Sequence, residues 1–179
     1  MSEVMLDLET LSTRSHATIL IIAGVKFDRN KGISKEIPSF YRRINVKSCE
    51  EKGMHIDPKT IQWWQDQDEQ IRKEAFEGER IDIKQALQEF GEWFGKSDRI
   101  WSNGATFDIP ILSEAYARCR LTPPWKYFQA RDTRTLFELA GITSKDLPKE
   151  NLHNALEDCR RQVWGVVESL RRLKEAIPK

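Results

Sequence analysis

The sequence contains few cysteines, and their positions do not suggest that they pair. Cys49, Cys119 and Cys159 are odd in number, lie far apart and form no Cys-x-x-Cys motif. Such spacing indicates neither a disulfide framework nor a zinc site. We therefore expect a reducing, cytoplasmic setting and a fold that is held together by its core.

Long hydrophobic runs are also absent. The longest apolar stretch, residues 19–25, includes Gly24 and is far too short to cross a bilayer. It predicts a buried strand instead. The first residues include Glu3, Asp7 and Glu9, and so lack the basic start and apolar stretch of a signal peptide. We expect a protein without a membrane partner.

Neither sign of charge is in excess. The chain has 29 basic and 28 acidic residues, a formal charge of +1. An anionic partner would therefore have to be held by local patches or by bound metal. The 39% hydrophobic and 32% charged residues are typical of a globular protein, and a chain of 179 residues predicts one domain, residues 1–179, with a real core.

Apolar periodicity and turn residues divide the chain into alternating elements. Strands are predicted over residues 3–9, 19–27, 39–46, 100–102 and 127–130. Helices are predicted over residues 59–67, 83–94, 109–118, 133–140 and 154–173. Turn residues at 28–32 favour a hairpin between the second and third strands. The order predicts an α/β fold whose mixed sheet has an antiparallel start, later parallel strands and helices on both faces.

The first cluster of chemical interest is Asp7-Leu8-Glu9, at the end of the first predicted strand. Because strand side chains alternate, the two acids project from one face while Leu8 projects from the other. Two adjacent carboxylates suit a hard cation such as Mg²⁺ or Mn²⁺. A solvated strand end is the alternative reading of these two residues alone.

The second cluster is the segment Trp-Ser-Asn-Gly-Ala-Thr-Phe-Asp, residues 101–108. A strand ends here in a glycine turn, and Asp108 lies where the next helix begins. Asp108 could cap that helix, which is the better interpretation of the residue in isolation. It could also be a metal ligand at the sheet edge, where sites of α/β proteins gather.

The third cluster is His153-Asn154-Ala155-Leu156-Glu157-Asp158, at the entry to the last predicted helix. Ala155 is small enough to let this helix approach the sheet closely. A lone histidine at a helix start is usually structural or exposed. His153 becomes a candidate proton acceptor if metal ligands converge beside it, because imidazole titrates near neutrality.

The three clusters together are far more specific than any one of them. Each lies at a strand end or a helix start, so one pocket could collect Asp7, Glu9, Asp108, Asp158 and His153. Two Mg²⁺ or Mn²⁺ ions about 4 Å apart could then bind a scissile phosphate, assist the attacking water and stabilise the leaving 3′ oxygen. The pattern predicts phosphodiester hydrolysis with the acids as ligands and His153 as general base.

These residues resemble the DEDDh exonucleases, the DnaQ-like branch of the RNase H-like fold. The order matches the family's motifs: D-x-E at Asp7 and Glu9, N-x-x-x-F-D ending at Asp108, and H-x-A-x-x-D from His153 to Asp158. The resemblance implies a 3′-to-5′ exonuclease that acts on single-stranded DNA or RNA with Mg²⁺ or Mn²⁺ and releases nucleoside monophosphates. Dimers are frequent in that family, so a homodimer is a further expectation.

Other segments are similar to a narrower group, the phage exonuclease A-like and mycobacterial exoribonuclease-like members. They are Ile-Gln-Trp-Trp at 61–64, Pro-Pro-Trp at 123–125 and Arg-Asp-Thr-Arg-Thr at 131–135. The resemblance implies substrate contacts around the first two motifs, at Leu8, Thr10, Leu11, Asn103 and Phe107. For Leu11, an ordinary strand end is an equal alternative.

Several residues near these motifs have two readings. Trp63 and Trp64 are adjacent, so on a helix both cannot face the core, and one is free to stack on a base. Asp132 lies between Arg131 and Arg134, which suits a structural ion pair or phosphate contacts. The basic residues Arg160 and Arg161 suit a solvated helix face or contact with phosphate.

Three functions fit this sequence. The leading one is the exonuclease. The second is a non-catalytic nucleic-acid-binding module of the same fold, which a missing acid or base would favour, and none of the five is missing. The third is an enzyme for very short oligonucleotides or another phosphodiester. The motifs do not separate DNA from RNA, because sugar selection depends on contacts to the 2′ position.

Overall fold

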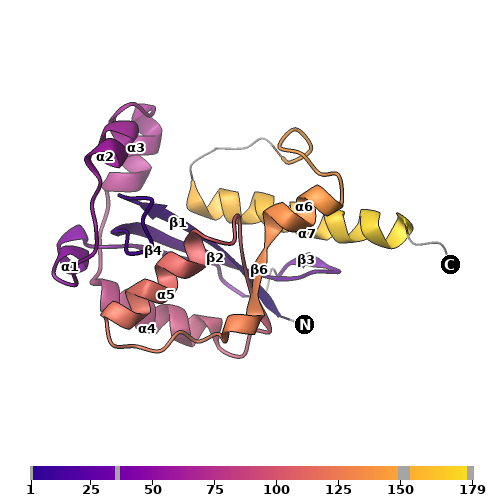
Figure 1. Cartoon of the computed structure of the whole chain (residues 1–179), viewed down its shortest axis with the longest axis horizontal. Helices are drawn as coiled ribbons and strands as arrows, with labels where there is room; N and C mark the ends of the chain where they lie inside the picture. Colours follow the sequence, from indigo (N-terminus) through magenta and orange to yellow (C-terminus); the bar gives the residue numbers. More distant parts are fainter. Residues whose placement is uncertain (1, 35–36, 149–153, 177–179) are drawn as a thin grey trace.

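A computed structural model describes residues 2–34, 37–148 and 154–176 of the chain. A mixed sheet runs through its middle in the order β3-β2-β1-β5-β6, with β4 also paired to β2 (Figure 1). The strands β1 and β2 are antiparallel, whereas β1 with β5 and β5 with β6 are parallel. This confirms the predicted antiparallel start followed by parallel strands. The strands are β1 (Glu3–Thr10), β2 (Ile19–Asp28), β3 (Gly32–Ile33), β4 (Phe40–Arg43), β5 (Arg99–Ser102) and β6 (Ala130–Asp132).

Helices cover both faces of the sheet, as predicted. The helices are α1 (Val46–Glu50), α2 (Pro58–Gln65), α3 (Glu69–Phe76), α4 (Ile83–Phe94), α5 (Asp108–Arg118), α6 (Thr133–Leu139) and α7 (Ala155–Ala176). On one face, α4 and α5 enclose a core cluster with alternate residues of β1. On the other face, α2, α3, α6 and α7 enclose a second cluster (Figure 1).

The strand β1 is buried on both faces, which explains the apolar run Val4-Met5-Leu6 in its first half. Val4, Leu6 and Leu8 enter the first cluster, whereas Met5 enters the second. Asp7 and Glu9 alternate with Leu8 and therefore lie on the face covered by α7. This alternation places two acids beside a helix N-terminus rather than in bulk water.

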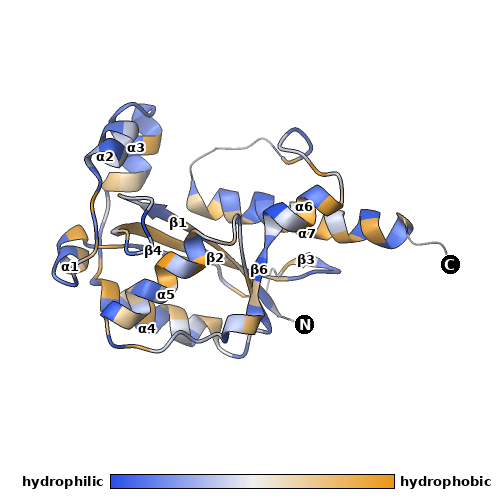
Figure 2. Cartoon of the chain, in the orientation of Figure 1, coloured by the Kyte–Doolittle hydropathy of each residue, from blue (hydrophilic) through white to orange (hydrophobic). Residues whose placement is uncertain are grey.

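The hydropathy of the elements follows this layering. The central strands are mostly apolar, although β1 becomes polar toward its end, and the helices carry one apolar side and one polar side (Figure 2). In α4, for example, Ile83, Leu87, Phe90 and Phe94 are fully or almost fully buried, as the helical spacing predicts. Among the described residues, no helix combines the length and the apolar character that crossing a membrane requires.

Three short elements were not predicted, and one prediction was wrong. The helices α1 and α3 and the strand β3 fall in segments that the sequence left without an element. Residues 127–129 were predicted to be strand, but they form a 3-10 turn, η1 (Tyr127–Gln129), which includes Tyr127 and Phe128. Both rings are exposed, and strand pairing starts only at Ala130.

Candidate active site

Three carboxylates meet where the end of β1 faces the start of α7. Asp7 and Glu9 come from β1, and Asp158 from the beginning of α7; one oxygen of each lies within 4.8 Å of the others. The helix begins here because the Asn154 side chain accepts hydrogen bonds from the backbone N–H groups of Leu156 and Glu157. The side chain of Ala155 is fully buried, so the first turn packs closely on the sheet.

Asp108 lies next to this group, at the first residue of α5. It is only 4% exposed, and its Oδ1 accepts a hydrogen bond of 3.1 Å from the backbone N–H of Leu8. It does not cap the helix: the N-cap residue is Phe107, and no side-chain cap is formed. Asp108 stands outside the group within 4.8 Å, but its charge raises the pKa values of Asp7 and Glu9. One of its oxygens is thus tied to β1 beside the other acids.

Burial and mutual repulsion disfavour ionisation of these acids. Burial raises the pKa of Asp7 well above its usual range, and the charges of Asp108, Glu9 and Asp158 raise it further. Burial, followed by the charges of Asp158 and Asp108, raises the pKa of Glu9 to about 8. Burial also raises the pKa of Asp108 to about 6, although the N–H of Leu8 and the charge of Arg134 oppose this.

A bound divalent cation would offset this repulsion. Carboxylate oxygens clustered on one side of a sheet are the ligands that Mg²⁺ and Mn²⁺ prefer, and a cation restores the ionised form of each acid. Asp7, Glu9, Asp108 and Asp158 therefore fit a metal centre by their chemistry and by their proximity.

A cavity of about 360 Å³ opens beside the acids, between β1 and α7. It is lined by Asp7, Asn103, Phe137, Leu147, Asp158, Arg161 and Gln162. Two of these residues contact the acids: Gln162 Nε2 donates to Asp7 Oδ1 over 2.9 Å, and Arg161 Nη1 lies 3.9 Å from Asp158 Oδ1. The motifs did not reveal Gln162. Its position four residues after Asp158, on the same side of a helix, is the signal that could have found it.

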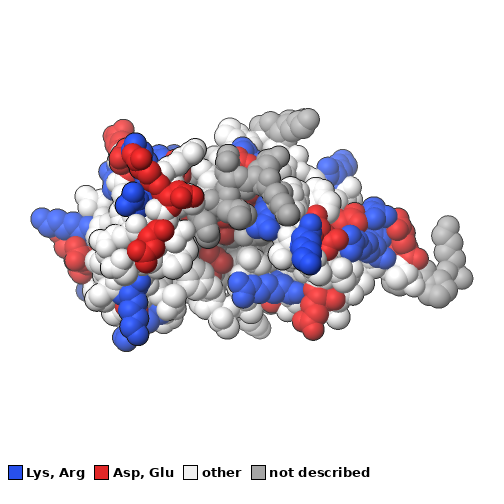
Figure 3. Space-filling view, turned by 90° about the horizontal axis from the view of Figure 1, so that it is seen from above, with Lys and Arg blue, Asp and Glu red and all other residues white. Residues whose placement is uncertain are grey.

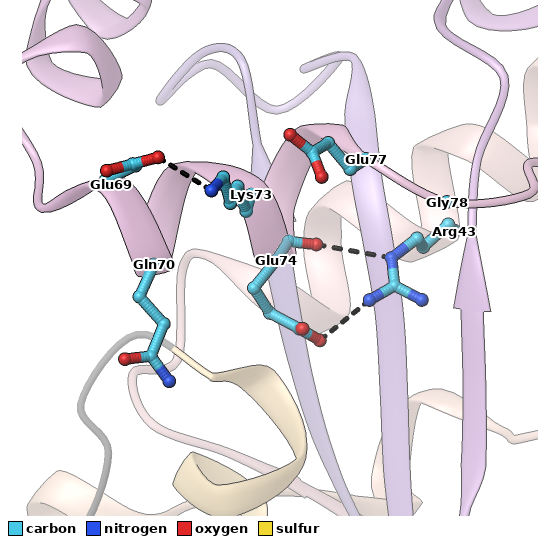
Figure 4. A pocket seen from close by; sticks show the side chains of 7 residues that line it. All are labelled: Arg43, Glu69, Gln70, Lys73, Glu74, Glu77 and Gly78. Carbon is cyan, nitrogen blue, oxygen red and sulfur yellow. Dashed lines mark hydrogen bonds and ion pairs between the residues drawn. The ribbon is translucent and has the colours of Figure 1, made fainter.

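A larger hollow, about 630 Å³, lies between β4 and α3 (Figure 4). Its charged groups largely neutralise one another. Arg43 binds the carboxylate of Glu74 over 3.0 Å and also donates to its backbone oxygen, and Lys73 binds Glu69 over 2.6 Å. None of the predicted site residues that the structure describes lines it. Because its acids Glu69 and Glu74 form ion pairs, we interpret this hollow as a surface groove and not as a second acidic centre.

The predicted substrate-contact residues lie around the acids in different environments. Leu8 and Leu11 are each 4% exposed, with their side chains in the two core clusters. Thr10 is buried, and its backbone oxygen accepts the indole N–H of Trp64 over 2.9 Å. Asn103 lines the cavity and accepts a hydrogen bond from Thr133. The side chain of Phe107 is partly buried against the first core cluster.

The remaining candidates are placed as follows. His153 lies outside the described residues. Trp64 is almost fully buried and Trp63 is 42% exposed, so the pair divides between core and surface as the helical geometry requires. Asp132 caps α6, accepting from the backbone N–H groups of Arg134 and Thr135, and this role differs from both the ion pair and the phosphate contact that were considered.

Comparison with known proteins identifies the family. Residues 2–170 match the family described as 3′–5′ exoribonuclease Rv2179c-like domain. The chain belongs to this family. It thus carries a 3′-to-5′ exonuclease domain of the DnaQ type, which confirms the resemblance and the enzyme class inferred from the three motifs.

More distant relatives agree with this family. The chain is 25% identical to the exodeoxyribonuclease of Enterobacteria phage T4 over an alignment of 204 residues, which covers 96% of this chain and 90% of that protein. Its fold is similar to E. coli exonuclease I in complex with a 5cy-dA13 oligonucleotide, with a TM-score of 0.60 and 16% identity. A complex of the same enzyme with a dA16 oligonucleotide gives a TM-score of 0.62 and 14% identity. The alignment covers 97% of this chain but only about 40% of exonuclease I.

Proposed function

We propose that this chain removes nucleotides one at a time from the 3′ end of single-stranded DNA or RNA, releasing nucleoside 5′-monophosphates. The observation that carries the proposal is the convergence of Asp7, Glu9 and Asp158 within 4.8 Å, with Asp108 beside them, in a member of an exonuclease family. Carboxylates grouped this closely disfavour one another's ionisation unless cations bind between them. Enzymes that hydrolyse phosphodiesters use such cations.

Asp7, Glu9, Asp108 and Asp158 would hold two Mg²⁺ or Mn²⁺ ions. When bound, such cations supply positive charge to the phosphate oxygens and lower the pKa of water. The chain fixes the acids beforehand: the Leu8 N–H holds one oxygen of Asp108, and the Gln162 amide holds one oxygen of Asp7. Because these carboxylates are already held in place, they need to move less when a metal binds.

His153 is the proposed general base. It takes the proton of the attacking water, because a neutral imidazole accepts protons near neutral pH. The motif His-x-Ala-x-x-Asp supports this assignment by analogy with the family, since Ala155 and Asp158 stand at the matching positions. Replacing His153 with Ala should lower kcat with little change in metal affinity. Replacing Asp158 with Ala should lower both kcat and the affinity for the metal.

The sugar preference follows from neither the family nor the relatives alone. The family description names RNA, and the T4 relative is a deoxyribonuclease. We propose that both polymers enter the cavity beside the acids, whose lining includes the apolar side chains of Phe137 and Leu147 and the amide of Asn103. Apolar and amide groups of this kind contact bases and sugars without demanding one sequence.

The test uses matched DNA and RNA oligonucleotides that carry a 5′ label, with 3′ ends free or blocked. We expect stepwise shortening of free ends only with added Mg²⁺ or Mn²⁺, and protection of blocked ends. Asp7→Asn should abolish shortening while the protein stays folded. Glu175→Gln is the control. It removes an acid near the C-terminal end of α7, far along the helix from Asp158, and should keep full activity. Intact substrates with both metals would refute the proposal.

A further inference from the structure

Gln162 is a buried polar residue whose side chain reaches a proposed metal ligand. It lies on α7 four residues after Asp158 and is only 6% exposed. Its Nε2 donates a hydrogen bond of 2.9 Å to Oδ1 of Asp7, which lies on β1. The bond therefore joins the helix that supplies one acid to the strand that supplies two others.

Apart from Asp7, the neighbours of Gln162 on the buried side of α7 are apolar. Cys159, Val163 and Val166 occupy the same buried side of α7, where an unpaired amide is costly. The Oε1 atom of Gln162 is buried and finds no hydrogen-bond partner in the part of the chain that the structure describes. The interaction with Asp7 is thus the polar contact that this buried amide makes there.

The direction of the hydrogen bond follows from the chemistry of the two groups. An ionised carboxylate only accepts hydrogen bonds, so the NH₂ group of the amide must face Asp7 when a metal is bound. This bond lowers the pKa of Asp7, whereas burial and the neighbouring acids raise it. It also fixes the position of Oδ1, and a carboxylate has further lone pairs with which it can bind a cation.

We propose that Gln162 is a positioning residue that holds the Asp7 carboxylate in the orientation required to bind the divalent cation. The inference rests on the proposed function, because it assumes that Asp7 is a metal ligand. Asp108 is held in the same manner by the N–H of Leu8, so each of these two acids has its own donor. Donors of this kind fix the orientation of a ligand without touching the metal, and their loss costs about 10- to 100-fold in metal affinity or activity.

The test replaces Gln162 by Met, which keeps the volume and removes the donor, and by Asn, which keeps an amide but is one methylene too short. Ser169→Ala is the matched control, since Ser169 is also buried on α7 and its Oγ has no partner among the described residues. Binding of Mn²⁺ is measured by calorimetry without substrate, and the unfolding temperature is measured in a chelator.

We expect both Gln162 variants to bind Mn²⁺ about 10- to 100-fold more weakly than the wild type, and Ser169→Ala to bind it normally. In activity assays, the Mn²⁺ concentration for half-maximal rate should rise, with kcat at saturating metal changed less. If one Gln162 variant fails to fold, the other still tests the donor.

Three outcomes would overturn the inference or its basis. If a folded Gln162 variant binds Mn²⁺ like the wild type, the proposed role is wrong although the metal centre stands. If Ser169→Ala weakens binding equally, the effect comes from loosening of α7, and the inference again fails. Absence of Mn²⁺ binding in the wild type would instead refute the proposed function itself.

Discussion

Arg160 and Arg161 are neighbours on α7 but meet different surroundings. Arg160 is exposed and forms an ion pair with Glu157 on the surface. Arg161 lines the cavity beside Asp7 and Asp158, and its Nε is buried without a hydrogen-bond partner in the described part of the chain. A buried guanidinium N–H next to the proposed metal centre is suited to a phosphate oxygen of the substrate. The structure therefore favours Arg161 over Arg160 as the phosphate contact.

Replacing Arg161 with Ala should lower kcat/KM by about 10- to 100-fold, because a hydrogen bond to a charged group contributes about 1.5–3 kcal/mol. Arg160→Ala removes the same charge one residue earlier and should change kcat/KM by less than about twofold. Initial rates on a 5′-labelled oligonucleotide at fixed ionic strength measure both. Equal losses in the two variants would indicate general attraction of the polyanion rather than a specific contact.

At the level of residues, the acids could be predicted from the sequence more readily than the side chains that contact them. Asp7 and Glu9 are identifiable because strand alternation sends both to one face of β1. Gln162 is an ordinary helix residue whose partner, Asp7, lies 155 positions away in the chain, and Arg161 is a helix residue that lines the cavity beside Asp7 and Asp158. Their roles depend on the way α7 packs on β1, which no local pattern specifies.

Among the elements, α2 is joined to the end of β1 by two hydrogen bonds. The Trp64 indole N–H donates to the backbone oxygen of Thr10 over 2.9 Å, and the N–H of Asp57, the α2 N-cap, donates to the oxygen of Leu11 over 2.8 Å. Thr10 follows Glu9 directly. The helix thus holds the backbone of Thr10 and Leu11, directly after the acids of β1.

Trp64→Phe should lower the free energy of unfolding by about 1–3 kcal/mol, since it removes a hydrogen bond and leaves a space in the second core cluster. Exonuclease activity should fall as well, because Thr10 loses its support beside Glu9. Trp63→Phe changes the neighbouring, 42% exposed indole and should cost less than about 0.5 kcal/mol. Urea unfolding of both variants measures the difference; equal stabilities would contradict the assigned role of Trp64.

Close packing of α7 on α6 requires a glycine at position 165. A Cβ there would lie 2.5 Å from Cζ of Phe137 and 2.9 Å from Cδ2 of Leu147, both of which line the cavity. Gly165→Ala should therefore destabilise the protein by about 1–3 kcal/mol despite the higher helix propensity of Ala.

Gly91 in α4 provides the matched comparison for Gly165. Its nearest neighbour would be the Tyr116 hydroxyl at 3.7 Å, an ordinary contact distance. Gly91→Ala should therefore stabilise the protein by about 0.5–1 kcal/mol, since Ala is the better helix former. Thermal unfolding of the two variants should show changes of opposite sign. A stabilising Gly165→Ala would mean that α6 and α7 can separate without penalty.

Element prediction succeeded where the pattern was long and failed where it was short. The periodic helix over 83–94 was predicted at its observed bounds. The helix α1 spans five residues, too few for a period of 3.6 to be recognised. The helix α3 is held partly by its Glu69–Lys73 pair and by packing of Ala75 in the second core cluster. Both helices are shorter than α4, and their local apolar spacing was not enough to predict them.

On the face of the molecule that Figure 3 shows, basic and acidic residues are interspersed. With a formal charge of +1, the chain has no long-range field that would attract a polyanion. The acidic cluster is instead a local concentration of one sign, and burial adds to its cost. The metal-free fold therefore carries an electrostatic penalty that depends on pH.

The stability of the metal-free protein should fall as pH rises from about 4.5 to 8. The pKa of Glu9 rises from 4.5 to about 8 and that of Asp108 from 3.8 to about 6 on folding. In this window the folded state holds more protons than the unfolded state, so raising the pH favours unfolding. The lowered pKa values of Asp28, Asp146 and Glu168 act at lower pH and do not oppose this trend.

Unfolding temperatures in a chelator between pH 5 and 8.5 measure the effect, and each 1 kcal/mol lost corresponds to about 2–4 °C in a chain of this size. Glu9→Gln removes one of the three acids with raised pKa values, Asp7, Glu9 and Asp108, and should make the profile less steep. Added Mn²⁺ should raise the unfolding temperature more at pH 8 than at pH 5.5, because metal binding requires deprotonated ligands. A wild-type profile as flat as that of Glu9→Gln, with the same Mn²⁺ shift at both pH values, would show that the four acids do not act as one electrostatic unit.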